Sequence, residues 1–226
     1  MAERSSIFDM IGPVMIGPSS SHTAGVVRIG RVARRVLNDE PAQATITFYN
    51  SFATTYEGHG SDRAIIAGLL DFKTDDERIR EALEIAQERE LHYKFRSVLS
   101  AGKLHPNSIR VTMQGKTGRN SEIVGVSRGG GLITIAEVDG FHANFSAQSH
   151  TLIIQAEDVP GSVAFFTSVL KYEHCNIATM TVGRKSKRGD AKLIMEMDSG
   201  LRPLTVEYLR SMDWVKEVTY IPDIDL

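Results

Sequence analysis

The chain has 226 residues, of which 42% are hydrophobic and 24% are charged, and it contains one cysteine. This composition excludes a disordered chain, a collagen-like chain and a small disulfide scaffold. Lysine and arginine number 26 against 28 acidic residues, a balance that argues against nucleic acid as the main partner. At roughly 100 to 150 residues per domain, the length predicts two domains. We place their boundary near Gln148, which gives domains at 1–147 and 148–226.

The single cysteine, Cys175, predicts a cytoplasmic protein without a cysteine-based metal site of its own. It cannot form an intrachain disulfide, and Arg4 and Asp9 interrupt any apolar leader. No run approaches the ~18 apolar residues of a membrane span, so we expect no membrane association. An iron–sulfur cluster or a cysteine-based zinc site needs several thiolates. Any such centre must therefore belong to a partner chain.

The N-terminal part is predicted to mix helices and strands. A short apolar segment at 7–14 precedes the loop 17–23, and a helix follows to about Leu37, with one apolar face formed by Val26, Ile29, Ala33, Val36 and Leu37. The opposite side of this helix carries four arginines, which we interpret as a solvated basic face: Arg28, Arg31, Arg34 and Arg35.

A strand at 43–49, an irregular polar loop at 50–62 and a helix at 63–70 come next. A second helix is predicted at 74–90, with Thr74 as its N-cap and Glu77 completing a capping box.

From residue 107 onward, short alternating runs predict a chain rich in strands. Antiparallel hairpins are expected from the runs 108–114, 122–128, 132–138 and 141–145. The glycines at 129–131 have no helix after them, so a dinucleotide-binding fold is disfavoured. The last third predicts the order βαββαβ on an antiparallel sheet, with strands at 151–156, 176–182, 192–197 and 215–221 and helices at 162–172 and 204–212. The fold class is therefore α+β.

A cluster of hydroxyls lies where the first helix begins. Free N–H groups at a helix start favour an anion, so this loop is expected to bind a carboxylate or a phosphate through Ser19, Ser20, Ser21, His22 and Thr23. The alternative is that one serine simply caps the helix. Capping explains one hydroxyl and leaves the others unexplained.

His59 lies between Gly58 and Gly60, so backbone can approach closely on both sides of it. An imidazole in such a loop can move protons near neutral pH. The alternative is an ordinary solvated histidine. Glu57 and Asp62 flank it and are candidates for orienting the ring, although Asp62 suits the start of the next helix equally well.

Three motifs carry a resemblance to a known family: GPSSSHTAGVVRIGR at 17–31, YNSFA with GHGSD between 49 and 62, and SRGGG at 127–131. They resemble the β subunit of iron–sulfur-dependent L-serine dehydratase, over residues 5–226. The resemblance implies a cysteine-rich α subunit that carries a [4Fe–4S] cluster, with open iron acting on the hydroxyl of L-serine. It implies formation of pyruvate and ammonia without pyridoxal phosphate. The β subunit closes the substrate site.

The resemblance also implies residue roles. His59 is the acid–base candidate, and the substrate carboxylate is held by Ser19, Ser20, Ser21, His22 and Thr23, with help from Asn50, Ser51 and Thr54. The chain departs from the family pattern at Asn50, where glycine is usual, at Ser61, where threonine is usual, and at Arg128, where an apolar residue is usual. We interpret Arg128 as a surface hairpin residue.

The two domains resemble two further folds. The N-terminal domain is similar to the allosteric substrate-binding domain of some phosphoglycerate dehydrogenases, and the C-terminal domain resembles a ferredoxin-like ACT domain. ACT domains commonly bind amino-acid effectors at paired edges, and the matching residues are Asp158, Pro160, Gly161 and Asn176. The alternative is a tight turn and a polar strand end. Exposed sheet edges also predict homodimeric contacts.

Two functions stay open. The first is an enzyme subunit that is inactive without its cluster-bearing partner. The second is a freestanding amino-acid sensor in which the loop and the ACT site bind ligands without chemistry. A regulatory piece of a dehydrogenase is disfavoured because no nucleotide-binding half is present.

Overall fold

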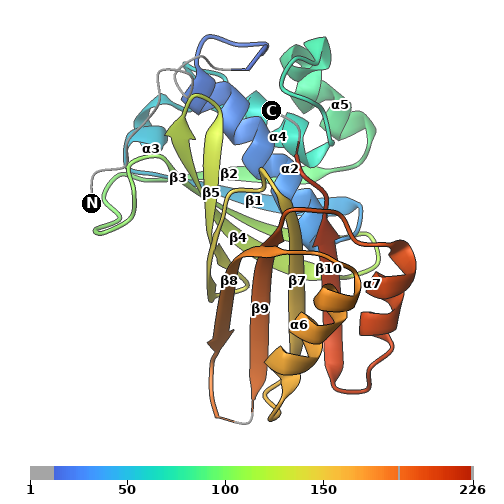
Figure 1. Ribbon diagram of the computed structural model, residues 1–226. Helices are drawn as coiled ribbons and strands as arrows, with labels where there is room; N and C mark the ends of the chain where they lie inside the picture. The colour runs from blue at the N-terminus through green and yellow to red at the C-terminus, as the bar shows by residue number, and fades with distance from the viewer. Residues whose placement is uncertain (1–12, 188, 225–226) are drawn as a thin grey trace. The chain divides into compact units, whose positions relative to one another are not determined.

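The computed structural model describes residues 13–187 and 189–224, so most of the apolar segment predicted at 7–14 lies outside the described residues. The chain divides into two compact units between Gly140 and Phe141, whereas the sequence placed the boundary near Gln148. Each unit combines helices with a β-sheet, which confirms the mixed α+β class (Figure 1).

The first unit opens with a π-helical turn, η1 (Ser20–Ala24), that continues directly into α2 (Gly25–Leu37). The elements that follow are β1 (Pro41–Tyr49), α3 (Ser51–Thr55), α4 (Ser61–Leu69), the 3-10 turn η2 (Glu77–Glu81), α5 (Ala82–Glu88), β2 (His92–Val98), β3 (Ser108–Gly115), β4 (Asn120–Gly129) and β5 (Leu132–Val138). The strand order is β2-β1-β3-β4-β5. The pair β1–β2 is parallel and the others are antiparallel, so the predicted hairpins β3–β4 and β4–β5 are confirmed.

Two local predictions were wrong. The segment 50–62 is not wholly irregular, because it contains α3. The helix predicted at 74–90 is two shorter pieces, and Asp76 caps the first by accepting from the Arg78 N–H at 3.0 Å. The hydroxyl of Thr74 instead donates to the carbonyl of Val14 at 3.1 Å. Asp76 has the extended backbone that an N-cap requires, and its carboxylate also pairs with the Arg78 side chain.

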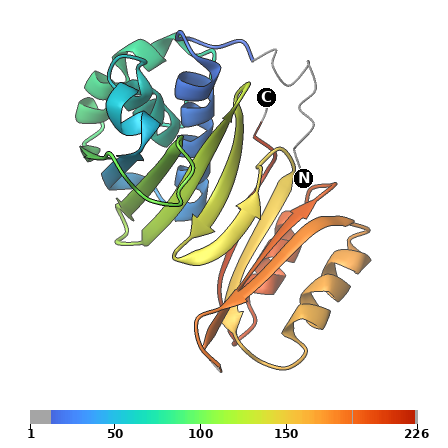
Figure 2. The ribbon, with the colours of Figure 1, turned by 90° about the vertical axis from the view of Figure 1, so that its left-hand side faces the viewer.

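Helix α2 packs against β4 on one face of the sheet (Figure 2). All five residues of its predicted apolar face are buried. The fit is close, since a Cβ atom on Gly125 of β4 would lie 2.7 Å from Cγ2 of Ile29. Ser127 of β4 meets the start of α2, where its hydroxyl donates to the carbonyl of Ser21 at 2.9 Å. The sheet therefore fixes both the position and the beginning of α2.

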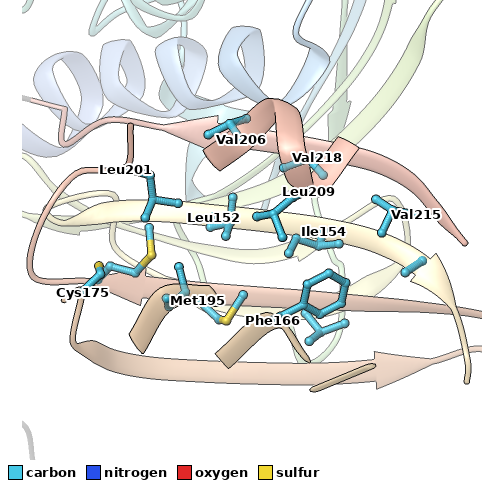
Figure 3. Packing of buried hydrophobic residues seen from close by; sticks show 14 residues of the cluster. Leu152, Ile154, Phe166, Cys175, Met195, Leu201, Val206, Leu209, Val215 and Val218 are labelled. Carbon is cyan, nitrogen blue, oxygen red and sulfur yellow. The ribbon is translucent and has the colours of Figure 1, made fainter. Parts of the chain in front are cut away.

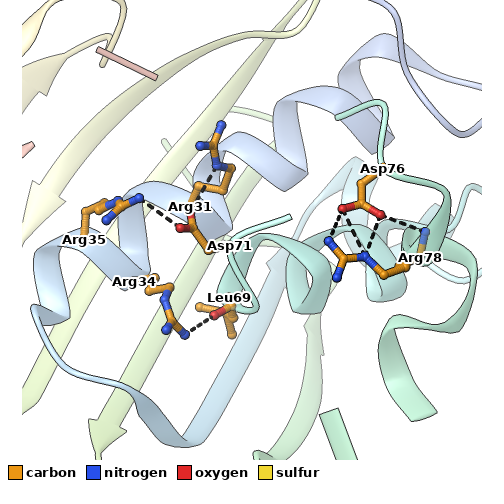
Figure 4. Close-up of polar contacts among 7 residues, drawn as sticks. All are labelled: Arg31, Arg34, Arg35, Leu69, Asp71, Asp76 and Arg78. Carbon is orange, nitrogen blue, oxygen red and sulfur yellow. Dashed lines mark hydrogen bonds and ion pairs between the residues drawn. The ribbon is translucent and has the colours of Figure 1, made fainter. Parts of the chain in front are cut away.

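The sequence predicted a solvated basic face on α2, but three of its four arginines bind the end of α4 (Figure 4). Arg31 and Arg35 both pair with Asp71, at 3.3 and 2.9 Å. Arg34 donates to the carbonyl of Leu69 at 2.9 Å. Basic side chains at a helix C-terminus donate hydrogen bonds to the free carbonyls and interact favourably with the negative end of the helix dipole. These arginines therefore join two helices.

The fourth arginine of that side, Arg28, is buried with 3% of its surface exposed. Its guanidinium donates to the carbonyl of Gly131 in the β4–β5 turn. The three glycines of this turn have φ of 95°, 59° and 79°, a left-handed conformation that glycine adopts without strain. The glycine triplet thus shapes a hairpin turn rather than a nucleotide-binding loop.

Helices α2 and α4 touch backbone to backbone at two glycines. A Cβ atom on Gly68 would lie 2.2 Å from the Val27 carbonyl oxygen and 2.7 Å from Cα of Gly30. A Cβ atom on Gly30 would lie 2.6 Å from the Ile65 carbonyl oxygen. Side chains are thus excluded from the crossing, and the two helices come closer than side-chain contact allows.

We predict that Gly30→Ala and Gly68→Ala each destabilise the protein by about 1–3 kcal/mol, because the new methyl group overpacks the crossing. Intrinsic helix propensity alone would give the opposite sign, since alanine is favoured over glycine by about 1 kcal/mol. Thermal and denaturant unfolding measure the change. Gly58→Ala is the control, because its nearest neighbour would be 3.9 Å away. Equal stability of all three variants would refute tight packing at the crossing.

The second unit contains β6 (Phe141–Phe145), β7 (His150–Glu157), α6 (Ser162–Tyr172), β8 (Ile177–Arg184), β9 (Asp190–Met197), α7 (Pro203–Arg210) and β10 (Val215–Ile221). Strands β10-β7-β9-β8 form an antiparallel sheet in that order. From β7 onward the order βαββαβ is the one the sequence predicted.

Apolar side chains fill the space between this sheet and its two helices (Figure 3). Leu152 and Ile154 of β7 and Met195 of β9 meet Phe166 of α6 and Leu209 of α7. Alternate residues of a strand face the same side, so one face of each central strand supplies the core. None of the helices within 13–187 and 189–224 combines the length and the apolar character that crossing a bilayer requires.

Candidate active site

Two sequence motifs meet in the first unit. The loop before α2 contributes His22, and the turn between α3 and α4 contributes His59; their ring centroids lie 4.7 Å apart. Hydrogen bonds tie the two segments together: the Ser61 hydroxyl donates to the His22 carbonyl at 2.8 Å, and the Thr23 hydroxyl to the His59 carbonyl at 3.4 Å. The histidines therefore belong to one structural feature.

The serines of the loop mainly serve the loop itself. The Ser19 hydroxyl oxygen accepts from the backbone N–H of His22 at 3.2 Å, so Ser19 is the helix cap that the alternative interpretation required. The hydroxyls of Ser19 and Ser21 lie 3.3 and 3.0 Å from Nδ1 of His22. Helix capping therefore explains only Ser19. The imidazole of His22 is the second partner of the Ser19 hydroxyl and the partner of the Ser21 hydroxyl.

Thr55 connects the two histidines. Its hydroxyl lies 3.1 Å from Nε2 of His22 and donates to the carbonyl of Ser51 at 2.9 Å. Because that hydrogen is used, the Thr55 oxygen accepts from His22, which must carry its proton on Nε2. The carbonyl of Thr55 lies 3.1 Å from Nδ1 of His59. A carbonyl only accepts, so His59 carries its proton on Nδ1 and keeps the lone pair of Nε2 free.

The two rings differ in their surroundings. His22 is half-buried and packs edge-on against Phe52, whereas His59 is exposed. Burial holds the pKa of His22 below its ordinary value, and the nearby His59 is a second, smaller cause of the same shift. The unfolded chain then binds this proton more readily than the folded chain, so His22 contributes stability above pH about 6.5 that is lost as the pH falls.

A cavity of about 340 Å³ opens beside His59, and His22 is not among the residues that line it. Thr23, Glu57, His59, Arg63 and Arg80 contribute to its lining. We call residues 17–23 the hydroxyl loop. Of this loop, only Gly17, Pro18 and Thr23 line the cavity. The imidazole of His59 is thus placed at a cavity of the size typical for a small ligand.

Comparison with known proteins agrees with these motifs. The family model for the serine dehydratase beta chain matches residues 6–138. The chain belongs to the serine dehydratase beta-chain family. It is 43% identical to "Probable L-serine dehydratase, beta chain" of Bacillus subtilis (strain 168), over 96% of this chain and 98% of that protein. It is 33% identical to "L-serine dehydratase, beta chain" of Peptoniphilus asaccharolyticus, over 91% of each.

A more distant relative is named for a different activity. The chain is 27% identical to "D-3-phosphoglycerate dehydrogenase" of Bacillus subtilis (strain 168), over 87% of this chain but only 35% of that protein.

Two of the departures from the beta-chain family pattern have a structural explanation. Asn50 has φ 50° and ψ −116°, a conformation in which glycine is at ease and asparagine is tolerated. Ser61 is fully buried, and its hydroxyl keeps the bond to the His22 carbonyl that a threonine could also make. Arg128 is exposed and its Nε lies 3.4 Å from the Thr134 hydroxyl, which confirms a surface hairpin residue.

The remaining predicted site residues lie around α3. The Asn50 side chain donates to the Leu104 carbonyl at 3.0 Å and accepts from the Ala101 N–H at 2.9 Å, so it holds the loop between β2 and β3. The Thr54 hydroxyl donates to the Ser51 carbonyl at 2.9 Å. These side chains bind backbone rather than the histidine pair. Thr55, which the sequence did not single out, is the residue that reaches it.

The residues proposed for an effector do not come together within one copy of the second unit. Gly161 is the N-cap of α6 with φ 87°, and Asp158 pairs with Arg184 at 2.7 Å, both at the end of β7. Asn176 lies at the start of β8, where it donates to Asp198 at 2.7 Å. The register pairs Ile177 with Met197 and Arg184 with Ala191. Asp158 and Asn176 therefore lie at opposite ends of the sheet.

We predict that Thr55→Val changes the tautomer of His22 and lowers the stability by about 1–3 kcal/mol, because Nε2–H loses its acceptor in a half-buried position. Nitrogen-15 chemical shifts of labelled histidine report the tautomer. Thr55→Ser keeps the hydroxyl and should behave as the parent. Thr54→Val removes a hydroxyl that bonds to the same carbonyl and is the matched control. A parental His22 spectrum in Thr55→Val would disprove the connection.

Proposed function

We propose that this chain is the β subunit of an iron–sulfur-dependent L-serine dehydratase, a lyase that converts L-serine to pyruvate and ammonia together with an α subunit. The beta-chain family supports this function, and so do the names of the two relatives matched over nearly their whole length. The observation that carries it is the contact between the His22 and His59 rings, with His59 lining a small cavity.

The cluster belongs to the α subunit in this proposal. Among the described residues, no three His, Cys, Asp or Glu side chains are grouped so as to hold a metal ion. Cys175 is buried in the second unit, where its thiol donates to the Ser199 carbonyl at 3.3 Å. The described part of this chain thus offers no ligand set for a cluster. When bound in the α subunit, a cluster with an open iron supplies a Lewis acid for the hydroxyl of serine. A cytoplasmic location, expected from the single thiol, is part of the same proposal.

His59 is the proposed base. Dehydration removes the α-proton and the β-hydroxyl of L-serine and gives aminoacrylate, which hydrolyses to pyruvate and ammonia. Nε2 of His59 has its lone pair free because the Thr55 carbonyl holds the proton on Nδ1. An exposed imidazole beside a cavity is placed to accept a proton from a substrate there.

The hydroxyl loop is proposed to bind the substrate carboxylate. The loop lies at the start of a continuous helical segment whose N–H groups favour an anion. The residues that we propose for binding are Ser19, Ser20, Ser21, His22 and Thr23. Thr23 is the member that lines the cavity directly. Ser51 acts through Thr55, while Asn50 and Thr54 support the surrounding backbone.

The test is anaerobic co-expression with the cognate α chain, followed by assay of pyruvate formed from L-serine. We expect activity only when both chains are present. His59→Ala should lower turnover on the order of 10²-fold or more, as expected for loss of a general base. His92→Ala, an exposed histidine on β2, is the control and should retain parental turnover.

Activity of this chain alone, or turnover of His59→Ala within twofold of the parent, would contradict the proposal. A complex that binds L-serine without forming pyruvate would instead favour the freestanding sensor.

We propose further that the second unit is an ACT domain that senses an amino acid. The order βαββαβ and the similarity to a D-3-phosphoglycerate dehydrogenase support this assignment. β8 is an end strand of its sheet. Antiparallel pairing of β8 with β8 of a second copy would bring Asn176 of one copy beside Asp158, Pro160 and Gly161 of the other. Such a pair unites residues that one copy keeps apart.

We predict that L-serine titrated into the chain binds at this paired edge and that Asn176→Ala weakens the binding on the order of tenfold, since one hydrogen-bonding group is lost. Calorimetry measures the affinity, and light scattering measures the mass. A monomer that binds L-serine with the same affinity in the parent and in Asn176→Ala would overturn the paired site.

A further inference from the structure

The cavity beside His59 has more positive than negative charge in its wall. Thr23 comes from the hydroxyl loop, Glu57 and His59 from the turn after α3, Arg63 from α4 and Arg80 from η2. Separate segments of the chain therefore contribute to one wall. Two arginines and one glutamate are thus among the residues that line a volume of about 340 Å³.

The two arginines differ from Arg78 of the same unit in their pairing. Arg78, in the same turn as Arg80, forms an ion pair with Asp76 at 2.6 Å. Neither Arg63 nor Arg80 forms a hydrogen bond or an ion pair through its side chain with any residue in the described ranges. Asp62, beside Arg63, is half-buried; burial raises the pKa of its carboxyl, while attraction to the Arg63 charge acts in the opposite direction. Neither guanidinium is thus held in an ion pair within the described ranges, although Arg63 is attracted to Asp62.

The hydroxyl loop cannot by itself neutralise a carboxylate in this cavity. The hydroxyls of Ser19 and Ser21 are engaged with His22, and the Thr23 hydroxyl and the backbone N–H groups carry no net charge. Hydrogen bonds from ionised donors are roughly twice as strong as neutral ones. The guanidinium groups of Arg63 and Arg80, two further lining residues of the cavity, supply the positive charge that the loop lacks.

We propose that Arg63 and Arg80 bind the carboxylate, and Glu57 the ammonium group, of a small zwitterionic amino acid in this cavity. The proposal rests on the proposed function and adds to it a second set of substrate-binding residues. Glu57 is oriented by Tyr56, whose hydroxyl donates to its Oε1 at 2.9 Å. Thr23 lines the same cavity from the loop side, with its hydroxyl donating to the His59 carbonyl.

The experiment uses the complex with the α subunit and three ligands. L-serine has both charges, L-serinamide lacks the carboxylate, and L-glycerate lacks the ammonium group. Arg63→Gln and Arg80→Gln should each raise the KM for L-serine by about tenfold, because each loses one charged hydrogen-bonding group. The double variant should raise this KM by about a hundredfold. The kcat of all three variants should stay within about threefold of the parent. Inhibition by L-serinamide should be unchanged. Glu57→Gln should weaken the binding of L-serine and leave the binding of L-glycerate unchanged.

Two further variants serve as controls. The double variant Arg63→Lys with Arg80→Lys keeps the charge and should have an intermediate KM. Arg96→Gln removes an exposed arginine of β2 outside the cavity and should have the parental KM.

Binding is also measured by calorimetry in the His59→Ala complex, in which turnover is suppressed. A folded double glutamine variant that keeps the parental affinity for L-serine within twofold would overturn the proposal, and so would an equal loss of affinity for L-serinamide. A parental complex that binds L-serine through the arginines but forms no pyruvate would contradict only the proposed function. A parental complex that does not bind L-serine would contradict both.

Discussion

The backbone contact between α2 and α4 is the constraint on which the site depends. Helix α2 continues from the turn that contains His22, and α4 begins two residues after His59. Gly30 and Gly68 let the two helices approach without side chains between them. The starts of both helices are consequently held together, and the two imidazoles face each other at 4.7 Å. A wider crossing would separate the loop from the turn, even if every residue of both motifs were retained.

Thr55 contacts both histidines and determines which nitrogen of each ring carries the proton. One side chain hydroxyl and one carbonyl from the same residue assign opposite tautomers to the two histidines. His22 becomes a half-buried neutral donor to Thr55, and His59 becomes an exposed acceptor at the cavity. The base that we propose for the reaction needs a free lone pair, and Thr55, the last residue of α3, holds the proton of His59 on Nδ1 and so leaves Nε2 free. The chain's membership of the serine dehydratase beta-chain family suggests the reaction, and the geometry is the basis for the roles that we propose.

Local patterns predicted the second unit best. Helix α6 at Ser162–Tyr172 and strand β10 at Val215–Ile221 have the bounds that turn residues and apolar spacing indicated. Strand β2 was not predicted, because it is largely exposed and its parallel pairing with β1 depends on contacts distant in sequence. Arg31 and Arg35 of α2 were misassigned to solvent for the same reason, since their partner Asp71 lies 36–40 positions away. Similarly, the motifs identified His22 and His59 as candidates, but only the fold shows that Thr55 links them.

The most direct test of this account is the nuclear Overhauser effect between the ring protons of His22 and His59 in histidine-labelled protein. With ring centroids 4.7 Å apart, a cross-peak between the two rings is expected. Its absence, with both rings assigned and the protein folded, would show that the helix crossing does not unite the two motifs.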